Sequence, residues 1–311
     1  MIRAASQSEV VHPSFGSDNP AACRAGRRTP RGSWAGADSL ARMRLVTWNI
    51  NSIRSRVDRA LAFLERTGTD VLALQETKCK DEQFPRAAFE AAGYEVATFG
   101  LSQWNGVALI SRVGLAEVER GFAGQPTFAA PSAEPVVEAR AIGATCGGVR
   151  VWSLYVPHGR ALGDPHYAYK LAWLDQLRAQ AAGWLADGPG DPGAQIALIG
   201  DWNVAPQDTD VWDLAFFADQ THISPPERAA FAAFAEAGYA EVTREHLPAD
   251  RMYTYWDYQQ LRFPRNEGMR IDFAYVSPAL AARTVGVTID RDERKGKGAS
   301  DHVPVILDLA H

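Results

Sequence analysis

Polar residues stand at or near the ends of several short apolar segments of this sequence. Active sites of α/β proteins are usually built from such strand ends. Taken one at a time, each polar residue has a structural explanation, because Asp caps turns, Asn tolerates turn geometry and Glu76 can simply face solvent. The segments with this pattern are TWNIN at 47–51, LALQETK at 72–78, LYVPHG at 154–159, LIGDWNV at 198–204, MRIDFAYVS at 269–277 and SDHVPV at 300–305.

Together, these segments supply oxygen ligands and one imidazole, a set that suits a hard cation such as Mg²⁺. Zinc has less support, since the sequence has no HExxH motif and no paired Cys or His ligands. The sequence also lacks a GxxxxGK(S/T) loop and a GxSxG elbow, which argues against a P-loop nucleotidase and an α/β-hydrolase. The candidate residues are Asn49, Asn51, Glu76, Asp201, Asn203, Asp272, Asp301 and His302.

The elements that must position these residues alternate between short apolar strands and helical stretches from Arg44 onward, which predicts an α/β fold. In the last third of the chain, strands follow one another with fewer intervening helices. This mixture favours paired β-sheets flanked by helices over a purely parallel sheet. We expect helices at about 55–66, 165–186 and 226–237, and strands at about 44–51, 70–76, 107–111, 149–156, 195–201, 252–256, 269–277 and 302–309.

Residues 1–42 differ in composition from the rest, with scattered Gly, Pro, Ser and Ala, six arginines and no periodic apolar spacing. A basic segment of this kind can be a transit peptide, but acidic residues interrupt it. We predict that residues 1–42 are a disordered extension, or that Met43, immediately before the first strand, is the true start. Residues 43–311 are expected to form a single catalytic domain.

The composition of the 311 residues, with 46% hydrophobic and 22% charged residues, is typical of a soluble globular protein. No apolar run approaches the roughly 20 residues that a membrane helix needs, so we expect no membrane partner. The three cysteines lack metal-ligand spacing and favour a reduced compartment, so a cytoplasmic protein is expected. With a net charge of −5, any nucleic-acid-binding surface must be local.

The motifs WNIN, LQETK, GDWN, RIDFAYVS and SDHVPV, in this order across 44–309, resemble the exonuclease III family of abasic-site endonucleases. GDWN and SDH belong to the wider group that includes deoxyribonuclease I, sphingomyelinases, inositol-polyphosphate phosphatases and deadenylases. The narrower signals are LQETK, the Tyr155-x-Pro157 segment and the aromatic run YTYWDY. The resemblance implies a four-layer sandwich of two mixed β-sheets flanked by helices, with the site at one edge.

The resemblance also implies a Mg²⁺ cofactor, with Mn²⁺ as the alternative. Glu76 would be the principal ligand, assisted directly or through water by Asn51, with Asp301 near the metal. The metal would neutralise charge on the scissile phosphate and stabilise the leaving 3′ oxygen. Three further residues complete the candidate metal set: Asp201, Asn203 and Asn49.

Catalytic roles follow from the same resemblance. Asp201 would position or deprotonate the attacking water, and Asn203 would help to hold the water and the phosphate. His302, paired with Asp272, would donate to a non-bridging phosphate oxygen. Tyr155 would contact the same phosphate or the leaving group.

An apolar pocket for the abasic sugar is implied at Tyr255, Met269 and Ile271, with Trp256 behind it. Met269 stands where some relatives carry Trp, and Trp256 is equally explained as a core residue at period-two spacing. The full set of expected substrate-binding residues is Asn49, His158, Tyr255, Trp256, Met269, Ile271 and Arg270.

Two members of that set have open alternatives. His158 lies where relatives often carry an amide, so it would bind phosphate, but a lone exposed His can also be without a role. Arg270 belongs to the basic loop 262–270, which suits insertion along a DNA groove as well as it suits an ordinary solvated loop.

The resulting prediction is a monomeric, Mg²⁺-dependent DNA-repair phosphodiesterase with abasic-site endonuclease and 3′–5′ double-strand exonuclease activity. Its partner would be double-stranded DNA with abasic sites or 3′ ends. The alternative is another phosphoesterase of the same fold, an inositol-phosphate phosphatase or a sphingomyelinase-like enzyme, for which a basic pocket or an exposed apolar loop is expected. A binding module without catalysis is disfavoured, because unpaired desolvated carboxylates are costly.

Overall fold

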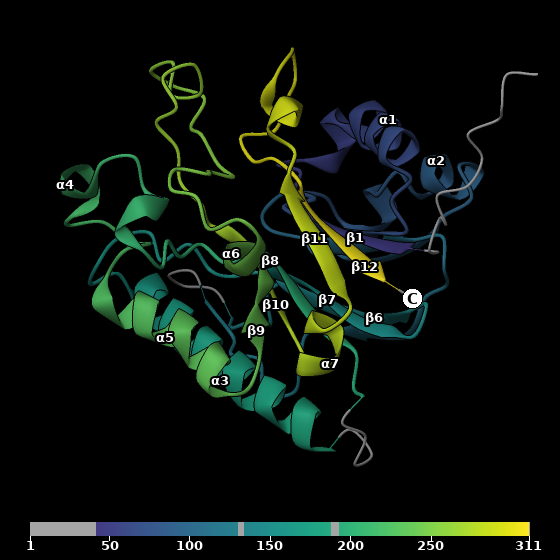
Figure 1. Cartoon of the computed structure of the whole chain (residues 1–311), viewed down its shortest axis with the longest axis horizontal. Helices are drawn as coiled ribbons and strands as arrows, with labels where there is room; N and C mark the ends of the chain where they lie inside the picture. The colour runs from purple at the N-terminus through teal and green to yellow at the C-terminus, as the bar shows by residue number, and fades with distance from the viewer. Residues whose placement is uncertain (1–41, 130–133, 188–192, 311) are drawn as a thin grey trace, which may run out of the picture. The chain divides into compact units, whose positions relative to one another are not determined.

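The structure is a computed structural model that describes residues 42–129, 134–187 and 193–310. Two six-stranded sheets dominate it (Figure 1). The first contains, in spatial order, β11 (Thr284–Ile289), β12 (Val305–Ala310), β1 (Arg42–Asn49), β2 (Val71–Gln75), β4 (Val107–Ser111) and β3 (Glu95–Phe99). The second contains β5 (Ala116–Arg120), β6 (Ala141–Cys146), β7 (Val149–Tyr155), β8 (Ile196–Asp201), β10 (Asp272–Val276) and β9 (Ala240–Glu241).

Both sheets are mixed. The β1–β2 pair and the β7–β8 pair are parallel, whereas the other neighbouring strands run antiparallel. A parallel pair needs a crossover connection, which α1 (Val57–Thr67) provides in the first sheet and α3 (Pro165–Asp187) provides in the second. The crossovers leave the carboxyl ends of each parallel pair side by side, and this is where the polar motifs begin.

The sheets pack face to face over an apolar core to which both contribute, for example Leu45 from the first sheet and Ile199 from the second. A second core joins the first sheet to α1 and α2 (Arg86–Ala91), and a third joins the other sheet to α3 and α5 (Pro225–Glu236). Figure 1 shows α3 and α5 side by side along one face of the second sheet. The predicted four-layer α/β sandwich is therefore confirmed.

Local sequence signals set the ends of the helices that flank the sheets. α1 ends at Gly68, which adopts a left-handed conformation (φ 61°) that only glycine reaches at low cost. α5 begins after Ser224 with a capping box to Glu227 and with proline in its first turn, where the missing N–H is not needed. The smaller helices are α4 (Leu214–Phe217), α6 (Val242–His246) and α7 (Pro278–Ala281).

The prediction of a strand at 252–256 is wrong. Tyr255 forms only isolated bridges, to Met269 and to His302, because the N–H groups of Thr254 and Tyr255 both donate to the Met269 carbonyl and interrupt a regular ladder. The apolar alternation that suggested a strand arises because Tyr255 and Trp256 pack into two separate clusters.

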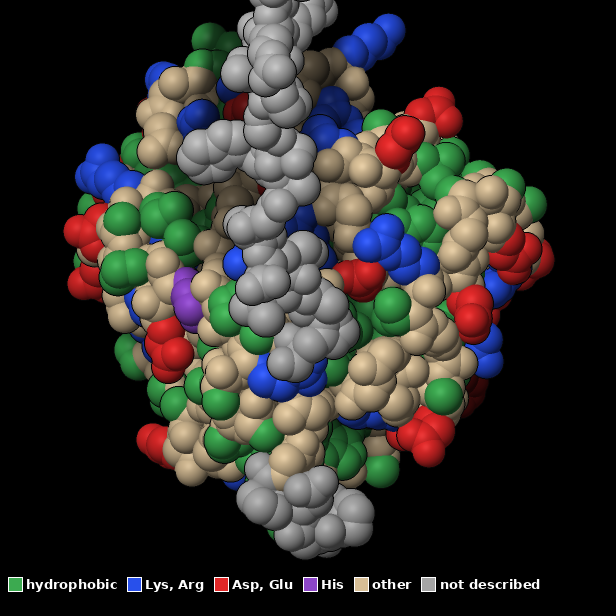
Figure 2. Space-filling model, turned by 45° about the vertical axis from the view of Figure 1, so that its right-hand side comes forward, with side chains coloured by type: hydrophobic (Ala, Val, Ile, Leu, Met, Phe, Trp, Pro, Cys, Tyr) green, Lys and Arg blue, Asp and Glu red, His purple; other side chains and the backbone are tan. Residues whose placement is uncertain are grey.

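The predicted extension, residues 1–42, lies outside the described residues apart from Arg42, the first residue of β1. Its disorder and the start at Met43 therefore stay predictions. Among the described residues, no helix combines the length and the apolar character needed to cross a bilayer. On the face that Figure 2 shows, acidic and basic side chains are interspersed.

Candidate active site

Four polar side chains gather where the parallel strand pairs of the two sheets end. Asn49 is the last residue of β1, Glu76 directly follows β2, and Tyr155 and Asp201 end β7 and β8. In the antiparallel neighbour β10, the first residue, Asp272, lies opposite Asp201. Residues from distant parts of the chain are thus brought together by sheet topology.

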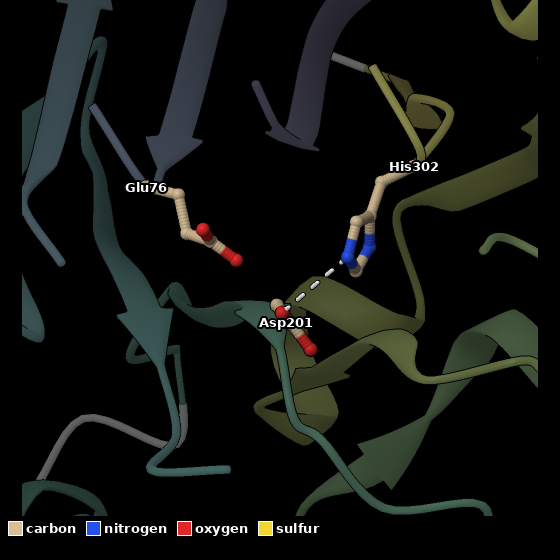
Figure 3. A group of neighbouring side chains, drawn as sticks. All are labelled: Glu76, Asp201 and His302. Carbon is tan, nitrogen blue, oxygen red and sulfur yellow. Dashed lines mark ion pairs between the residues drawn. The ribbon is translucent and has the colours of Figure 1, made fainter. Parts of the chain in front are cut away.

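Glu76, Asp201 and His302 form the centre of this cluster. One ligand atom from each lies within 4.8 Å of the other two. Figure 3 shows the three side chains converging from separate elements. The Asn49 amide connects the two carboxylates, since its Nδ2 donates to Glu76 Oε1 at 2.8 Å and to Asp201 Oδ2 at 2.9 Å.

His302 is held between two buried carboxylates. Its Nδ1 lies 2.9 Å from Asp272 Oδ2, and its Nε2 lies 3.8 Å from Asp201 Oδ2, which is longer than a hydrogen bond. Burial disfavours the charged ring, but the charges of Asp272 and Asp201 outweigh this and raise the pKa of His302 to about 10. The imidazolium form therefore carries a proton on Nε2 that no protein group in the described chain accepts at hydrogen-bond distance.

Asp201 is almost fully buried, and burial raises its pKa to about 7 although His302 and the Asn49 hydrogen bond act in the opposite direction. Asn203 has a left-handed backbone (φ 50°) that turns its N–H back onto Asp201 Oδ1 at 2.9 Å. The Asn203 Nδ2 donates to the Val156 carbonyl at 3.0 Å and lies 3.3 Å from Asp201 Oδ2. This carboxylate is thus oriented by two asparagines.

A second polar group extends from Glu76 towards solvent. Lys78 Nζ lies 2.7 Å from Glu76 Oε2 and donates to Asn51 Oδ1 at 2.6 Å, while Asn51 Nδ2 donates to Asp301 Oδ1 at 3.0 Å. Burial opposes the ionised form of Glu76, but Lys78 and the Asn49 hydrogen bond lower the pKa of this carboxyl overall. The donor set of carboxylates and amide oxygens suits a hard divalent cation.

Tyr155 faces the same cluster from the second sheet. Burial, reinforced by the nearby charge of Glu76, raises the pKa of Tyr155 well above its usual value, so the phenol keeps its proton and is a donor. The guanidinium of Arg140 lies 4.7 Å from the centre of the Tyr155 ring. Arg140 was missed from the sequence because nothing in the segment before β6 marks it as different from a surface arginine.

A pocket of about 330 Å³ adjoins the cluster. Tyr255 and Met269 line it as expected, and the Tyr255 ring centre lies 4.9 Å from that of His302. Ile271 is buried behind Met269 in the same apolar cluster and does not line the pocket. Arg262, from the basic loop 262–270, also lines it, together with residues that the sequence did not indicate, which include Trp212, Phe216 and His222.

A second hollow, of about 630 Å³, runs past Glu76, Lys78 and Tyr155. His158 and Arg160 line both hollows, so the two meet at the segment that follows β7. His158 is exposed, as a phosphate contact would require, and its ring packs edge to face on His222 at 4.6 Å.

Two expected substrate contacts need correction. Arg270 is 1% exposed, and its guanidinium donates to the carbonyls of Leu247, Ala249 and Met252. Its nitrogens are therefore used to hold a loop rather than presented to DNA. Trp256 is fully buried, where it packs with Tyr253 and Val303 in a cluster that does not line the pocket, so the core explanation holds for it.

Comparison with known proteins agrees with this geometry. The model of the Endonuclease/Exonuclease/phosphatase family matches residues 46–302. Exodeoxyribonuclease III of Haemophilus influenzae is 29% identical over 85% of this chain and 98% of its own length. An AP endonuclease structure from Archaeoglobus fulgidus superimposes with a TM-score of 0.78 at 31% identity, covering 86% of this chain and all of that one.

A 3′ phosphatase from Neisseria, solved with a product DNA hairpin, has a TM-score of 0.78 at 32% identity and covers 86% of this chain and 99% of its own. These relatives confirm the predicted family resemblance and the prediction of a DNA-repair nuclease that hydrolyses phosphodiesters. The chain belongs to the endonuclease/exonuclease/phosphatase family.

Proposed function

We propose that this enzyme cuts the DNA backbone at abasic sites and trims 3′ ends, using Mg²⁺, with Mn²⁺ as the alternative ion. The observation that carries this proposal is the convergence of Glu76, Asp201 and His302 within 4.8 Å, with Asp272 behind the imidazole. The matched relatives named an exodeoxyribonuclease III, an AP endonuclease and a 3′ phosphatase support these activities.

In the proposed site, Glu76 is the principal metal ligand, with Asn51 and Asp301 beside it and the remaining candidates within reach. When bound, the ion neutralises phosphate charge and stabilises the leaving oxygen. Asn49 keeps the Glu76 and Asp201 carboxylates apart by donating to both, which limits their mutual repulsion. Lys78 is a counter-charge for Glu76 that the substrate phosphate can share.

Asp201, in its ionised form, orients the attacking water and accepts its proton. A pKa of about 7 suits a general base that works near neutrality. Asn203 fixes this carboxylate through Asp201 Oδ1. His302 donates its Nε2 proton to a non-bridging phosphate oxygen, because the carboxylate nearest to that nitrogen is 3.8 Å away. Tyr155 supplies a second donor, which is uncharged.

The pocket beside His302 accepts the sugar at an abasic site. Tyr255 and Met269 form the apolar part of its wall, and an abasic sugar is extruded more cheaply than an intact nucleotide. Arg160 and Arg262 contribute guanidinium groups to the walls, but Arg262 is ion-paired with Glu267 at 2.6 Å, so Arg160 is the better candidate for a contact with the DNA backbone.

A monomeric state stays a prediction. A cytoplasmic location stays a prediction. The experiment that tests the proposal is incubation of purified protein with an abasic duplex, a 3′-phosphorylated duplex and a blunt duplex, each with Mg²⁺, Mn²⁺ or EDTA. We expect cleavage at the abasic site, removal of the 3′ phosphate and shortening of the blunt 3′ ends, all of them in the presence of metal. Metal-independent cleavage, or none of any substrate, would disprove it.

A further inference from the structure

A buried histidine that the sequence did not single out lies directly behind the proposed general base. His222 is 5% exposed and follows α4 in a loop. Its Nε2 lies 3.2 Å from Asn203 Oδ1, and the nitrogen of the same side-chain amide lies 3.3 Å from Asp201 Oδ2. His222 thus contacts the proposed general base, Asp201, only through Asn203.

The hydrogen-bond pattern fixes which way the Asn203 amide points. Its nitrogen must face the Val156 carbonyl, because two oxygens at 3.0 Å would repel each other. The amide oxygen is therefore the atom that faces His222, and His222 Nε2 must carry the proton in this contact. The reverse amide orientation would also place an oxygen 3.3 Å from the Asp201 carboxylate.

The remaining contacts of His222 support this tautomer. With the proton on Nε2, the Nδ1 lone pair accepts from the Thr221 hydroxyl at 3.1 Å. Both ring nitrogens then have suitable partners.

The backbone around His222 is held by a buried ion pair. Lys170 and Glu227 are both 0% exposed and contact each other directly. Glu227 accepts from the His222 N–H at 2.9 Å, and Lys170 Nζ donates to the Asn203 carbonyl at 2.6 Å. The same pair therefore anchors the loop of His222 and the backbone of Asn203, which fixes the distance between them.

We propose that His222 is a positioning residue for the reaction, whose Nε2–H locks the Asn203 amide so that its nitrogen faces Asp201. This inference rests on the roles proposed for Asp201 and Asn203. His222 touches neither water nor phosphate in this arrangement, and its effect passes through Asn203. Its edge-to-face contact with His158 gives it a second link to the substrate side of the pocket.

The test compares three substitutions of His222. Gln places its terminal nitrogen near the position of the imidazole Nε2, whereas Asn reaches only the position of Nδ1 and Leu has no donor. In His222→Leu and His222→Asn, we expect the single-turnover rate constant on an abasic duplex to fall by about tenfold, the scale of one lost buried hydrogen bond, with DNA affinity unchanged. His222→Gln should recover most of the rate.

A double-mutant cycle separates positioning from a general loss of structure. In an Asn203→Ala background, His222→Leu should cause no further loss of rate, because the group it orients is gone. A wild-type rate in both His222→Leu and His222→Asn would overturn the inference, as would a further tenfold loss in the Asn203→Ala background. If His222→Leu does not fold, the Gln and Asn variants make the same comparison. If Asn203→Ala alone keeps the wild-type rate, the proposed function of Asn203 is at fault instead.

Discussion

Replacing Asp272 by Asn tests how His302 is charged. Asp272 is fully buried, and its Oδ2 lies 2.9 Å from His302 Nδ1. At an effective dielectric constant of about 20, one unit charge at this distance is worth about 6 kcal/mol, or roughly four pKa steps. Since the pKa of His302 is raised to about 10 in the native protein, the ring should be charged at pH 8 there and neutral in Asp272→Asn.

The neutral ring of the variant would also have its proton on the wrong nitrogen. The Asn oxygen still accepts from Nδ1–H, so the lone pair faces the substrate from Nε2 and cannot donate to a phosphate oxygen. Loss of one such donor costs about a hundred- to a thousandfold in rate. We therefore expect a single-turnover rate lower by that factor at pH 8, with DNA affinity much less affected.

Two assays check this prediction on metal-free and metal-loaded protein. Imidazole ¹H–¹⁵N spectra report the charge and tautomer of His302 without any substrate, and rapid-quench cleavage gives the rate. Because the folded pKa is raised, the charge of His302 stabilises the native fold fully below about pH 6.5, and this contribution is lost as pH rises through about 10. The native protein and the variant should therefore differ most in thermal stability at or below neutral pH. A ring still charged at pH 8 in the variant, or an unchanged rate, would refute the reasoning.

Five further substitutions have distinct expected outcomes. Glu76→Gln should abolish metal-dependent activity while the fold survives, which Mg²⁺ titration calorimetry and circular dichroism would show. Asp201→Asn and His302→Ala should each lose about two or more orders of magnitude in kcat, and the double variant should be markedly less than additive because both act on one transition state. Tyr255→Ala should lower cleavage of abasic duplex about ten- to a hundredfold with unchanged metal affinity, measured in competition with intact duplex at fixed salt. Arg270→Leu should lower the free energy of unfolding by about 3–5 kcal/mol, because it removes the cation from a buried ion pair with Asp210, whose Oδ1 lies 3.6 Å from Arg270 Nε.

Each of these outcomes can fail in a recognisable way. If the Glu76→Gln variant keeps wild-type turnover at limiting Mg²⁺, Glu76 is not a metal ligand. Equal losses of DNA affinity and kcat/KM at constant kcat would contradict the catalytic roles of Asp201 and His302. If the Arg270→Leu protein is fully stable and binds DNA more weakly, Arg270 contacts the DNA groove as the sequence analysis expected.

Site residues could be predicted from the sequence where a polar residue stands at the end of an apolar strand. Glu76 and Asp201 stand at the ends of apolar strands, so their position at a sheet edge could be foreseen from local pattern alone. Their approach to within 4.8 Å of each other and of His302 could not, because it depends on how two separate sheets pack. The prediction that these three side chains lie together came from the family resemblance and not from the periodicity of the apolar residues.

The errors share a physical cause, which is that tertiary packing decides how a side chain is used. Arg270 has the sequence context of an exposed basic loop. It is nevertheless buried, because three carbonyls from another segment accept hydrogen bonds from its guanidinium. Trp256 and Tyr255 are neighbours in a regular aromatic pattern but pack into different clusters. His222 carries no motif, and its contact with Asn203, 19 residues away, is made only by the fold.

The central claim, a metal-dependent nuclease that selects abasic DNA, is tested most directly in a single competition reaction. Two duplexes of identical sequence, one with a single abasic site, are mixed with the enzyme at limiting concentration, and the cut positions are read on a sequencing gel with Mg²⁺ and with EDTA. Apart from the trimming of 3′ ends, we predict one internal cut, immediately 5′ to the abasic site, that requires the metal and is absent with Glu76→Gln. An abasic duplex left intact by protein that hydrolyses a phosphoinositide or sphingomyelin would contradict the claim.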